Sequence, residues 1–175
     1  MIYFVRHGET VWNVENKICG TTDSPLTELG HRQAAETGKK ILEKGIHADL
    51  ILYSPLSRAR ETARHISGLT GIPMQEEPRL IEQCFGKYES TPRNSEEFRE
   101  AKKQFLNRYE NGESMFRLAQ RIYNLLDDLQ KDGRDFILVA HNGIARVVES
   151  YFREMTNDEY AGFGLKNGEI REYRF

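Results

Sequence analysis

Three short apolar runs lie far apart in the sequence, and each one ends at a group of polar residues. The runs cover residues 2–5, 49–53 and 135–140. Apolar runs this short, rich in β-forming residues, are typical of strands that are buried on both faces of a sheet. This pattern restricts the possible folds more than any other feature, because it predicts a covered, parallel sheet.

Amphipathic helices are expected between and after these strands. Thr27 and Ser54 are predicted N-caps of the first two helices, and Pro55 is expected in the first position of the second. The expected helices cover residues 27–44, 54–70, 96–109, 114–131 and 144–154. A loop is expected over residues 11–26 and an extended segment over residues 79–83. A closing hairpin is expected over residues 161–175.

Strands that alternate with helices favour an α/β fold, a three-layer sandwich with a largely parallel central sheet flanked by helices. A length of 175 residues is usual for one domain. Residues 84–112 are the most polar stretch and are interpreted as a short helical lid inserted into that single domain, 1–175.

Charge and composition exclude several classes of partner. The chain has 25 basic and 27 acidic residues and a formal net charge of −2. It therefore lacks the excess of positive charge that is typical of proteins that bind nucleic acid or an anionic membrane. No apolar run approaches the roughly 20 residues of a membrane-spanning helix, and the N-terminus does not resemble a signal peptide. The two cysteines form neither a disulfide framework nor a zinc motif, so we expect a reduced, cytoplasmic protein.

Two histidines and two arginines are predicted to meet at one edge of the sheet. Arg6 and His7 end the first strand, Arg58 follows the second strand by about one helical turn, and His141 ends the third. Ligand sites in open α/β sheets lie just past the carboxyl ends of the strands. These four side chains, distant in sequence, are therefore expected to converge.

Phosphate chemistry fits this set of side chains best. Arginine presents a planar fork that matches phosphate oxygens and stays charged. An imidazole beside it can attack phosphorus and carry the phosphoryl group covalently. Two histidines could also bind a metal, but a third ligand would be needed and the arginines would repel the cation. The sequence therefore predicts a phosphate site with no metal and no cofactor.

The residues around these positions resemble the histidine phosphatase superfamily, in its phosphoglycerate-mutase-like branch. The resemblance covers nearly the whole chain and its blocks come in the family's order. The matching blocks are Arg6-His7-Gly8-Glu9-Thr10 with Trp12-Asn13, the segment from Gly20 to Ala34, Ser54-Pro55-Leu56-Ser57-Arg58-Ala59, Leu80-Ile81-Glu82 with Phe85-Gly86, Gly112-Glu113-Ser114, and Val139-Ala140-His141 with Gly143 and Arg146.

The resemblance implies a phosphoglycerate-mutase-like fold and a role for each matching residue. His7 would be the phosphorylated nucleophile, and Glu82 would protonate the leaving group and later activate water. Arg6, Arg58 and His141 would form the phosphate pocket. The further substrate-binding residues implied are Asn13, Gly20, Thr21 and Asn142, the last through its backbone at a helix start. Glu82 has nearby competitors for the acid role, namely Glu76, Glu77 and Glu89.

The chain departs from the mutases of this branch in its lid. The longer, arginine-rich lid that would grip a second phosphate or carboxylate is absent from residues 84–112, where Lys87 and Arg93 are isolated candidates. Cys19 also stands where mutases usually have threonine. A short lid implies a wet pocket, which favours hydrolysis over phosphoryl transfer to another molecule.

The function predicted from the sequence is therefore a metal-independent phosphatase that hydrolyses phosphomonoesters, acting on a small phosphorylated metabolite through a phosphohistidine. A phosphoglycerate mutase and a catalytically silent phosphate-binding module are the alternatives. An open site would also admit a phosphorylated protein side chain. The sequence specifies neither the physiological substrate nor the oligomeric state.

Overall fold

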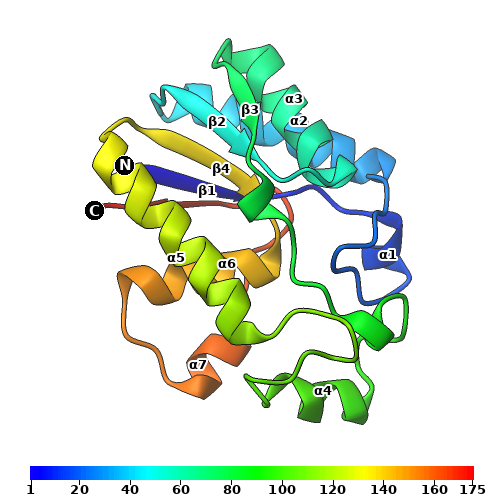
Figure 1. The fold of residues 1–175 in the computed structure, drawn as a ribbon. Coiled ribbons are helices and arrows are strands. Elements are labelled where there is room, and N and C mark those ends of the chain that lie inside the picture. Colours follow the sequence, from blue (N-terminus) through cyan, green and yellow to red (C-terminus); the bar gives the residue numbers. More distant parts are fainter.

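A five-stranded sheet forms the centre of the computed structural model, which describes residues 1–175 (Figure 1). The strand order is β3-β2-β4-β1-β5. The strands are β1 (Ile2–Arg6), β2 (Leu50–Tyr53), β3 (Met74–Glu76), β4 (Phe136–Ala140) and β5 (Ile170–Tyr173). All neighbours are parallel except β5, which runs antiparallel to β1.

The three strands expected from the sequence are confirmed as β1, β2 and β4, which are adjacent in the sheet. Their side chains alternate between two separate cores. Phe4 and Leu138 pack into one core, whereas Val5 and Val139 pack into the other. Strands buried on both faces in this way need no polar residues until they end, which explains the uninterrupted apolar runs.

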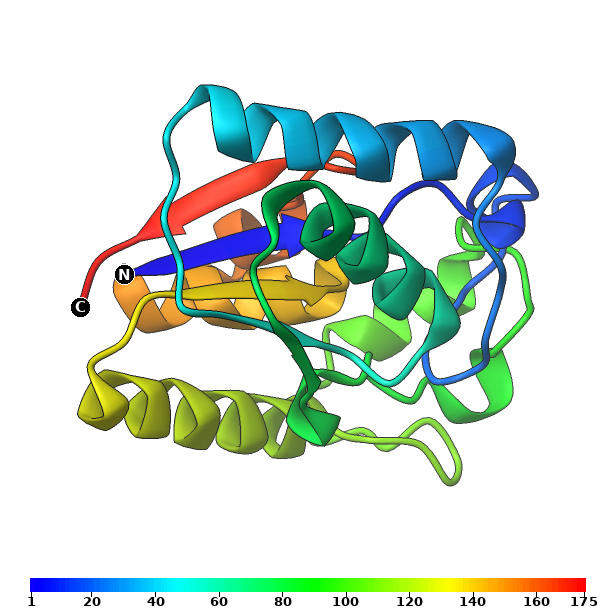
Figure 2. The same cartoon turned by 90° about the horizontal axis from the view of Figure 1, so that it is seen from above.

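Helices cover both faces of the sheet, so the three-layer α/β sandwich is confirmed (Figure 2). The helices α2 (Glu28–Glu43) and α3 (Ser57–Thr70) pack on one face. The helices α5 (Met115–Asp132) and α6 (Asn142–Phe152) pack on the other. None of the helices is both long and apolar enough to cross a membrane.

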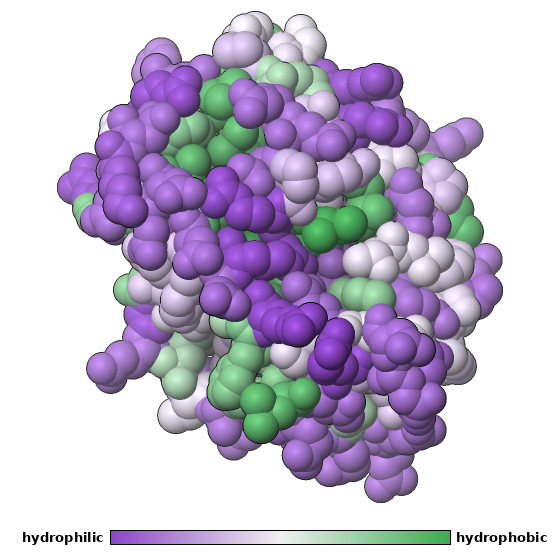
Figure 3. Space-filling view, in the orientation of Figure 1, coloured by the Kyte–Doolittle hydropathy of each residue, from purple (hydrophilic) through white to green (hydrophobic).

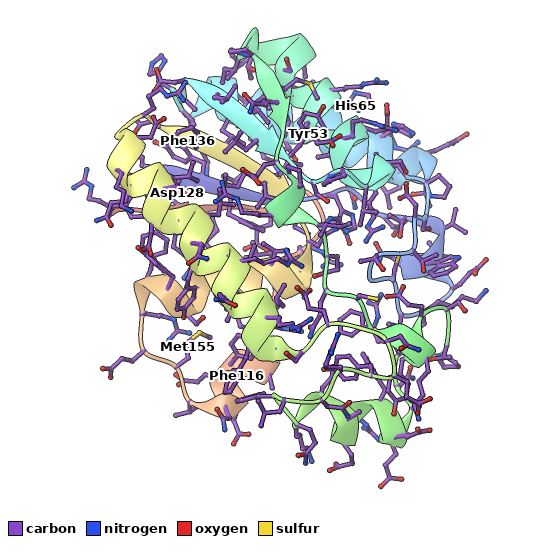
Figure 4. The ribbon with its side chains drawn as sticks, in the orientation of Figure 1. Tyr53, His65, Phe116, Asp128, Phe136 and Met155 are labelled. Carbon is purple, nitrogen blue, oxygen red and sulfur yellow. The ribbon has the colours of Figure 1, made fainter.

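The parallel arrangement sends the carboxyl ends of the central strands to the same edge. Phe136 begins β4 and Tyr53 ends β2, and Figure 4 labels them near opposite ends of these neighbouring strands. At the far end of the register, Arg6 of β1 pairs with Ala140 of β4. The residues that follow these strands therefore emerge side by side.

One predicted helix start is wrong. The Thr27 side chain accepts a hydrogen bond from the amide of Gly30 and caps α2 as expected. The helix α3, however, begins at Ser57 instead of residue 54. Its N-cap residue, Leu56, makes no side-chain hydrogen bond to the helix. The amide of Ser57 donates to Asp23 at 2.9 Å, so a carboxylate from a distant loop caps this helix.

Two short helices are absent from the sequence prediction. The first, α1 (Val11–Val14), lies in the segment 11–26 that was expected to be a loop, and α7 (Asn157–Gly162) precedes the last strand. Both begin with a capping box, in which Thr10 or Thr156 and the residue three positions later exchange hydrogen bonds. These local bonds stabilise helices too short to show an apolar period.

The lid differs from the prediction in its helix. The helix α4 covers only Glu96–Lys102, instead of residues 96–109, and Figure 1 shows it set apart from the sheet. Tyr109, Glu110 and Asn111 have positive φ angles, which no α-helix accommodates. The lid has a small hydrophobic core, in which Tyr88, Phe98, Ala101 and Tyr109 pack with Ile18 from the segment after α1.

The segments at the two ends of the sheet were also predicted imperfectly. Residues 79–83, expected to be extended, begin inside a short 3-10 turn at Pro78–Leu80, and a second such turn covers Gly86–Tyr88. The turn expected at residues 166–168 exists, since the amide of Glu169 donates to Lys166 O at 3.0 Å. The predicted hairpin does not form, because β5 pairs with β1 rather than with a preceding strand.

Candidate active site

A cavity of about 660 Å³ opens at the edge of the sheet where β1 and β4 end. This volume lies in the usual range for pockets that bind small molecules. Of the residues predicted to act in the site, Arg6, His7, Asn13, Arg58, Glu82 and Asn142 line it. His141 lies behind this lining with 1% of its surface exposed.

The His7 ring is held in one tautomer beside the cavity. Its Nδ1 lies 2.7 Å from the carbonyl oxygen of Gly8. A carbonyl oxygen only accepts, so Nδ1 carries the hydrogen, and the neutral ring leaves Nε2 with a free lone pair. Burial, followed by the charges of Arg58 and Arg6, holds the pKa of His7 well below its usual value of 6.5. The ring is therefore uncharged at neutral pH, with Nε2 unprotonated.

Arg58 is the most tightly held cation of the site. Its Nε donates to His141 Nδ1 at 3.2 Å, and its two terminal nitrogens donate to the carbonyl oxygens of Gly20 at 2.7 Å and Thr22 at 3.0 Å. Asp23 lies 3.5 Å from the same guanidinium. The Arg58 side chain is 1% exposed, so its charge is directed at the cavity rather than shared with bulk solvent.

Ser54, predicted as a helix cap, instead supports His141. Because Arg58 donates to Nδ1 of His141, the neutral ring carries its hydrogen on Nε2, which lies 2.7 Å from Ser54 Oγ. Burial, followed by Arg58 and then His7, lowers the pKa of His141 well below 6.5. The His7 and His141 ring centroids are 5.1 Å apart. Both ring nitrogens of His141 therefore have protein partners, and a donor role toward phosphate requires one of them to exchange.

Arg6 and Asn13 keep donors available for a ligand. Arg6 donates through one terminal nitrogen to Leu165 O at 2.5 Å, but its Nε is buried without a partner. Burial and the charge of Arg93 lower the pKa of Arg6 to about 10. The Asn13 side-chain oxygen accepts from the amide of Thr10 at 3.1 Å, which leaves its NH₂ group without a protein acceptor. An anion in the cavity would satisfy both groups.

Glu82 is fixed by the backbone at the start of α6. Its carboxylate accepts from the amides of Gln83 at 2.9 Å and Gly143 at 3.0 Å, and 6% of its surface is exposed. A Cβ atom at position 143 would collide with Glu82 Oε1, which explains the glycine there. The Gly143 amide, next to the Asn142 backbone that was expected to face the anion, is therefore used to position the carboxylate.

Gly20 and Thr21, predicted to bind substrate, do not line the cavity. Their amides donate to the carboxylate of Glu89 at 3.0 and 3.2 Å, and the amides of Thr22 and Phe85 donate to the same carboxylate. Glu89 thus joins the loop at residues 20–22 to the base of the lid. The carbonyls of this loop hold Arg58, so the loop acts on the site through that arginine.

The lid is more basic around the cavity than the sequence indicated. Arg93 lines the cavity as suggested, whereas Lys87 points elsewhere and pairs with Glu110 at 2.7 Å and Glu97 at 3.3 Å. Lys102 and Arg146 line the cavity and were not singled out as anion ligands. Lys102 lies in a short helix without a local motif, whereas Arg146 belongs to the His141 block but was given no role there.

The remaining predicted residues have structural partners. The side-chain oxygen of Asn142 accepts from the amide of Leu165 at 2.9 Å, so this side chain ties α6 to the segment before β5. Cys19 lines the cavity, and burial raises the pKa of its thiol to about 11. The structure contains no cluster of three or more His, Cys, Asp or Glu side chains that could hold a metal ion.

Comparisons with known proteins identify a matching family and several relatives. A family model described as the histidine phosphatase superfamily (branch 1) matches residues 2–175. A curated protein of Yersinia pestis named "Probable phosphoglycerate mutase GpmB" is 38% identical over 149 residues, covering 80% of this chain and 68% of that protein.

Two solved structures share the fold over nearly the whole chain. The alpha-ribazole phosphatase of Shigella flexneri has a TM-score of 0.82 at 25% identity, covering 97% of this chain and 87% of its own. A mycobacterial glucosyl-3-phosphoglycerate phosphatase, solved with VO3, has a TM-score of 0.84 at 25% identity, covering 97% of this chain and 88% of its own. The solved relatives are thus phosphatases, whereas the curated relative carries the name of a mutase.

Proposed function

Because this chain belongs to the histidine phosphatase superfamily, we propose that it hydrolyses phosphomonoesters of small metabolites through a phosphohistidine at His7, without a metal ion. The family and the enzyme class, a phosphoric monoester hydrolase, were predicted from the sequence and are confirmed by the comparisons. The covalent route, the residue roles and the kind of substrate are the substance of the proposal.

The state of the His7 ring is the observation that carries the proposal. The hydrogen bond from Nδ1 to Gly8 O leaves Nε2 unprotonated beside the cavity. In the first step Nε2 forms a bond to phosphorus while the bond from phosphorus to the ester oxygen breaks. The hydrogen bond from Nδ1 to Gly8 O is kept, and it stabilises the positive charge that develops on the ring.

The cations around His7 support the same reaction. Phosphoryl transfer is catalysed mainly by positioning and by charge placed around the equatorial oxygens. Arg6 has a buried Nε without a partner, and Arg58 is fixed by three protein acceptors. The free Nε–H of Arg6 and the remaining terminal N–H groups of Arg58 bind the phosphoryl oxygens in the ground state and in the transition state.

Glu82 is the proposed acid and base. It lines the same cavity as His7, and its carboxyl group is fixed by two backbone amides. Glu82 enters the first step protonated, and this proton passes to the departing alcohol oxygen, which leaves a carboxylate. In the second step it accepts a proton from water, whose oxygen attacks phosphorus and releases His7.

Hydrolysis of an aryl phosphate by the wild type and by His7→Ala, each with and without a chelator, tests the proposal. We expect chelator-resistant activity that is lost in the mutant. Mass spectrometry of protein quenched with base, in which phosphohistidine persists, should show one phosphoryl group on the peptide containing His7. Activity that needs a metal, or that survives in His7→Ala, would exclude this route.

A phosphoglycerate mutase is the second candidate, favoured by the name of the curated relative. A mutase returns the phosphoryl group to a sugar acid, whereas a phosphatase gives it to water. We propose hydrolysis because the lid has only the seven-residue helix α4 to exclude water. Mutase turnover primed with a bisphosphorylated acid, measured beside monoester hydrolysis, decides between them. A mutase rate above the hydrolysis rate would favour the second candidate.

A further inference from the structure

The strand β5 has one paired edge and one open edge. It pairs with β1 on one side, and no strand lies on its other side (Figure 2). None of the backbone hydrogen bonds formed outside helices and strands involves residues 170–175. The amides and carbonyls that point outward from this edge therefore have no partner in the chain. Such an edge is able to pair with a strand of another molecule.

Two unpaired charges of opposite sign lie along this edge. Arg171 and Tyr173 both donate to Glu149 of α6, so the odd-numbered residues of the strand face that helix. Side chains alternate between the faces of a sheet, and hence Glu172 and Arg174 share the opposite face. Both are exposed, and neither makes a hydrogen bond or an ion pair within the chain. A partner strand with the complementary pattern of charges would neutralise both.

The same edge of a second copy has this complementary pattern. In an antiparallel pair, residues that oppose each other point to the same face, so a two-fold axis perpendicular to the sheet must pass through a residue position. An axis at Tyr173 places Glu172 opposite Arg174 of the second copy, twice by symmetry. An axis at Arg171, Glu172 or Arg174 would instead place two like charges opposite each other. The charges therefore favour one register, centred on Tyr173.

A hollow beside this edge matches a side chain of the second copy in the same register. The hollow has a volume of about 400 Å³ and lies between α6 and β5, with Arg171 in its lining. The register places Phe175 of the second copy opposite Arg171, and therefore at this hollow. Phe175 is 38% exposed and the Arg171 side chain 48%, so the ring and the guanidinium are free to form a cation–π contact. One symmetry thus pairs the charges on one face and the aromatic ring on the other.

We propose that two copies of this chain associate through β5, with the two-fold axis at Tyr173, so that their sheets join into one continuous sheet. The face over α5 and the lid is mostly hydrophilic, with small separate apolar patches, and offers no broad apolar surface for a partner (Figure 3). Tyr173 pairs with Ile2 at the start of β1, whereas the cavity lies where β1 ends. Both cavities of the dimer therefore stay open, and the inference does not depend on the proposed function.

Sedimentation equilibrium of the full chain measures this association directly. We expect the wild type to show a monomer–dimer equilibrium between micromolar and millimolar concentrations, because a contact between two short strands is small. Glu172→Arg and Arg174→Glu each turn two pairs of opposite charges into two pairs of like charges. Each variant alone should therefore raise the dissociation constant by about tenfold or more. A wild type that stays monomeric over the whole range would overturn the proposal.

Charge complementation tests the register itself. An equimolar mixture of Glu172→Arg and Arg174→Glu should form heterodimers, because one variant then presents two positive side chains and the other two negative ones. The double variant Glu172→Arg/Arg174→Glu exchanges the two charges and should associate with itself as the wild type does. If neither the mixture nor the double variant recovers the dimer, the proposed register is wrong.

Variants at the hollow and at the other edge of the sheet complete the test. Phe175→Ala should raise the dissociation constant by about tenfold, the combined size of two cation–π contacts. Glu76→Arg is the matched control, because Glu76 is an exposed glutamate of β3, the opposite edge strand, and it should change nothing. Circular dichroism shows whether each variant is folded, so no step needs turnover. A dimer that is lost in Glu76→Arg but kept in the β5 variants would overturn the proposal.

Discussion

The two ring nitrogens of His7 are in different environments, and this difference sets the expected pH dependence of the reaction. Nδ1 donates to Gly8 O, while Nε2 has no protein partner. Attack requires an unprotonated Nε2. Since burial and the two arginines hold the pKa of His7 below 6.5, the nucleophile stays active when the pH falls to about that value.

We therefore expect kcat/KM for an aryl phosphate, corrected for ionisation of the substrate, to stay level between about pH 7.5 and about pH 6.5. The profile is measured with the wild type at constant ionic strength. An acid limb with an apparent pKa at or above 6.5 would contradict the prediction.

Glu82 is distinguished from the other glutamates by its contacts. Its carboxylate lines the cavity and accepts from Gly143, whereas Glu76 is an exposed residue of the edge strand β3. We expect Glu82→Gln to slow the hydrolysis of alkyl phosphates by about 100-fold or more and the hydrolysis of activated aryl phosphates much less. The reason is that only the alkoxide needs a proton to leave. Glu76→Gln is the control and should change neither rate. Equal losses on both substrate types would remove Glu82 from the acid role.

Site residues could be predicted from the sequence where they come directly after a buried strand or lie in a motif. His7 and Arg58 are examples, and the cavity contains both. Ser54 was misread because serine before proline is typical of a helix start, while its contact with His141 depends on two strands meeting in space. Lys102 was missed for the same reason, since the cavity that it lines is formed by segments far apart in the sequence.

At the scale of elements, the loop at residues 20–22 is positioned by Glu89. Four backbone amides donate to this carboxylate, and the loop's carbonyls in turn hold Arg58. A Cβ atom at Gly20 would collide with the Glu89 carboxylate and with Gln83 O, so only glycine allows this approach. We therefore expect Glu89 to act as a positioning residue for the proposed phosphate pocket, through Arg58.

Glu89→Gln should weaken inhibition by vanadate and lower kcat/KM by about 10-fold or more, because an amide NH₂ group faces amides that need an acceptor. Glu97→Gln is the matched control, since Glu97 is an exposed lid glutamate that contacts Tyr88 and Lys87. It should leave vanadate inhibition unchanged. A Glu89→Gln variant with a lower Tm but unchanged vanadate affinity would reduce Glu89 to a structural role.

Elements were predictable from sequence where their signal is local and repeated. The apolar spacing of α5 specifies that helix from the sequence alone, and in the structure the Ser114 side chain caps it. The strand β3 has three residues, two of them exposed, and so gives no alternating pattern. The position of β5 beside β1 depends on a strand more than 160 residues away, and hence no local pattern indicates it.

At the scale of the whole molecule, one domain with a short lid remains a prediction. The lid core includes Ile18 from outside the lid, and Glu89 ties the base of the lid to the loop that holds Arg58. We expect one cooperative transition in denaturant, with fluorescence of Trp12, the one tryptophan, coinciding with far-ultraviolet circular dichroism. Trp12 precedes the loop that contacts the lid, so an earlier fluorescence transition would show that this region unfolds separately.

The two buried histidines also link the stability of the whole chain to pH. The pKa values of His7 and His141 are lowered well below 6.5 in the folded protein, so the unfolded chain binds more protons as the pH falls below that value. The free energy of unfolding therefore decreases from about pH 6.5 downward, with a limiting slope of about 1.4 kcal/mol per pH unit for each histidine. Above about pH 6.5 both histidines are neutral in the folded and the unfolded chain, and they add no further pH dependence to the free energy of unfolding.

Denaturant unfolding of the wild type and of His7→Gln/His141→Gln between about pH 7.5 and about pH 5 measures this linkage. We expect the free energy of unfolding to fall more steeply for the wild type, because the double variant has lost the two groups that must become charged on unfolding. His47→Gln is the control, since this exposed residue lies far from the cavity. The same neutral rings that make an unprotonated nucleophile would thus limit the stability of the fold in acid. Parallel pH profiles for wild type and double variant would contradict this link between site and stability.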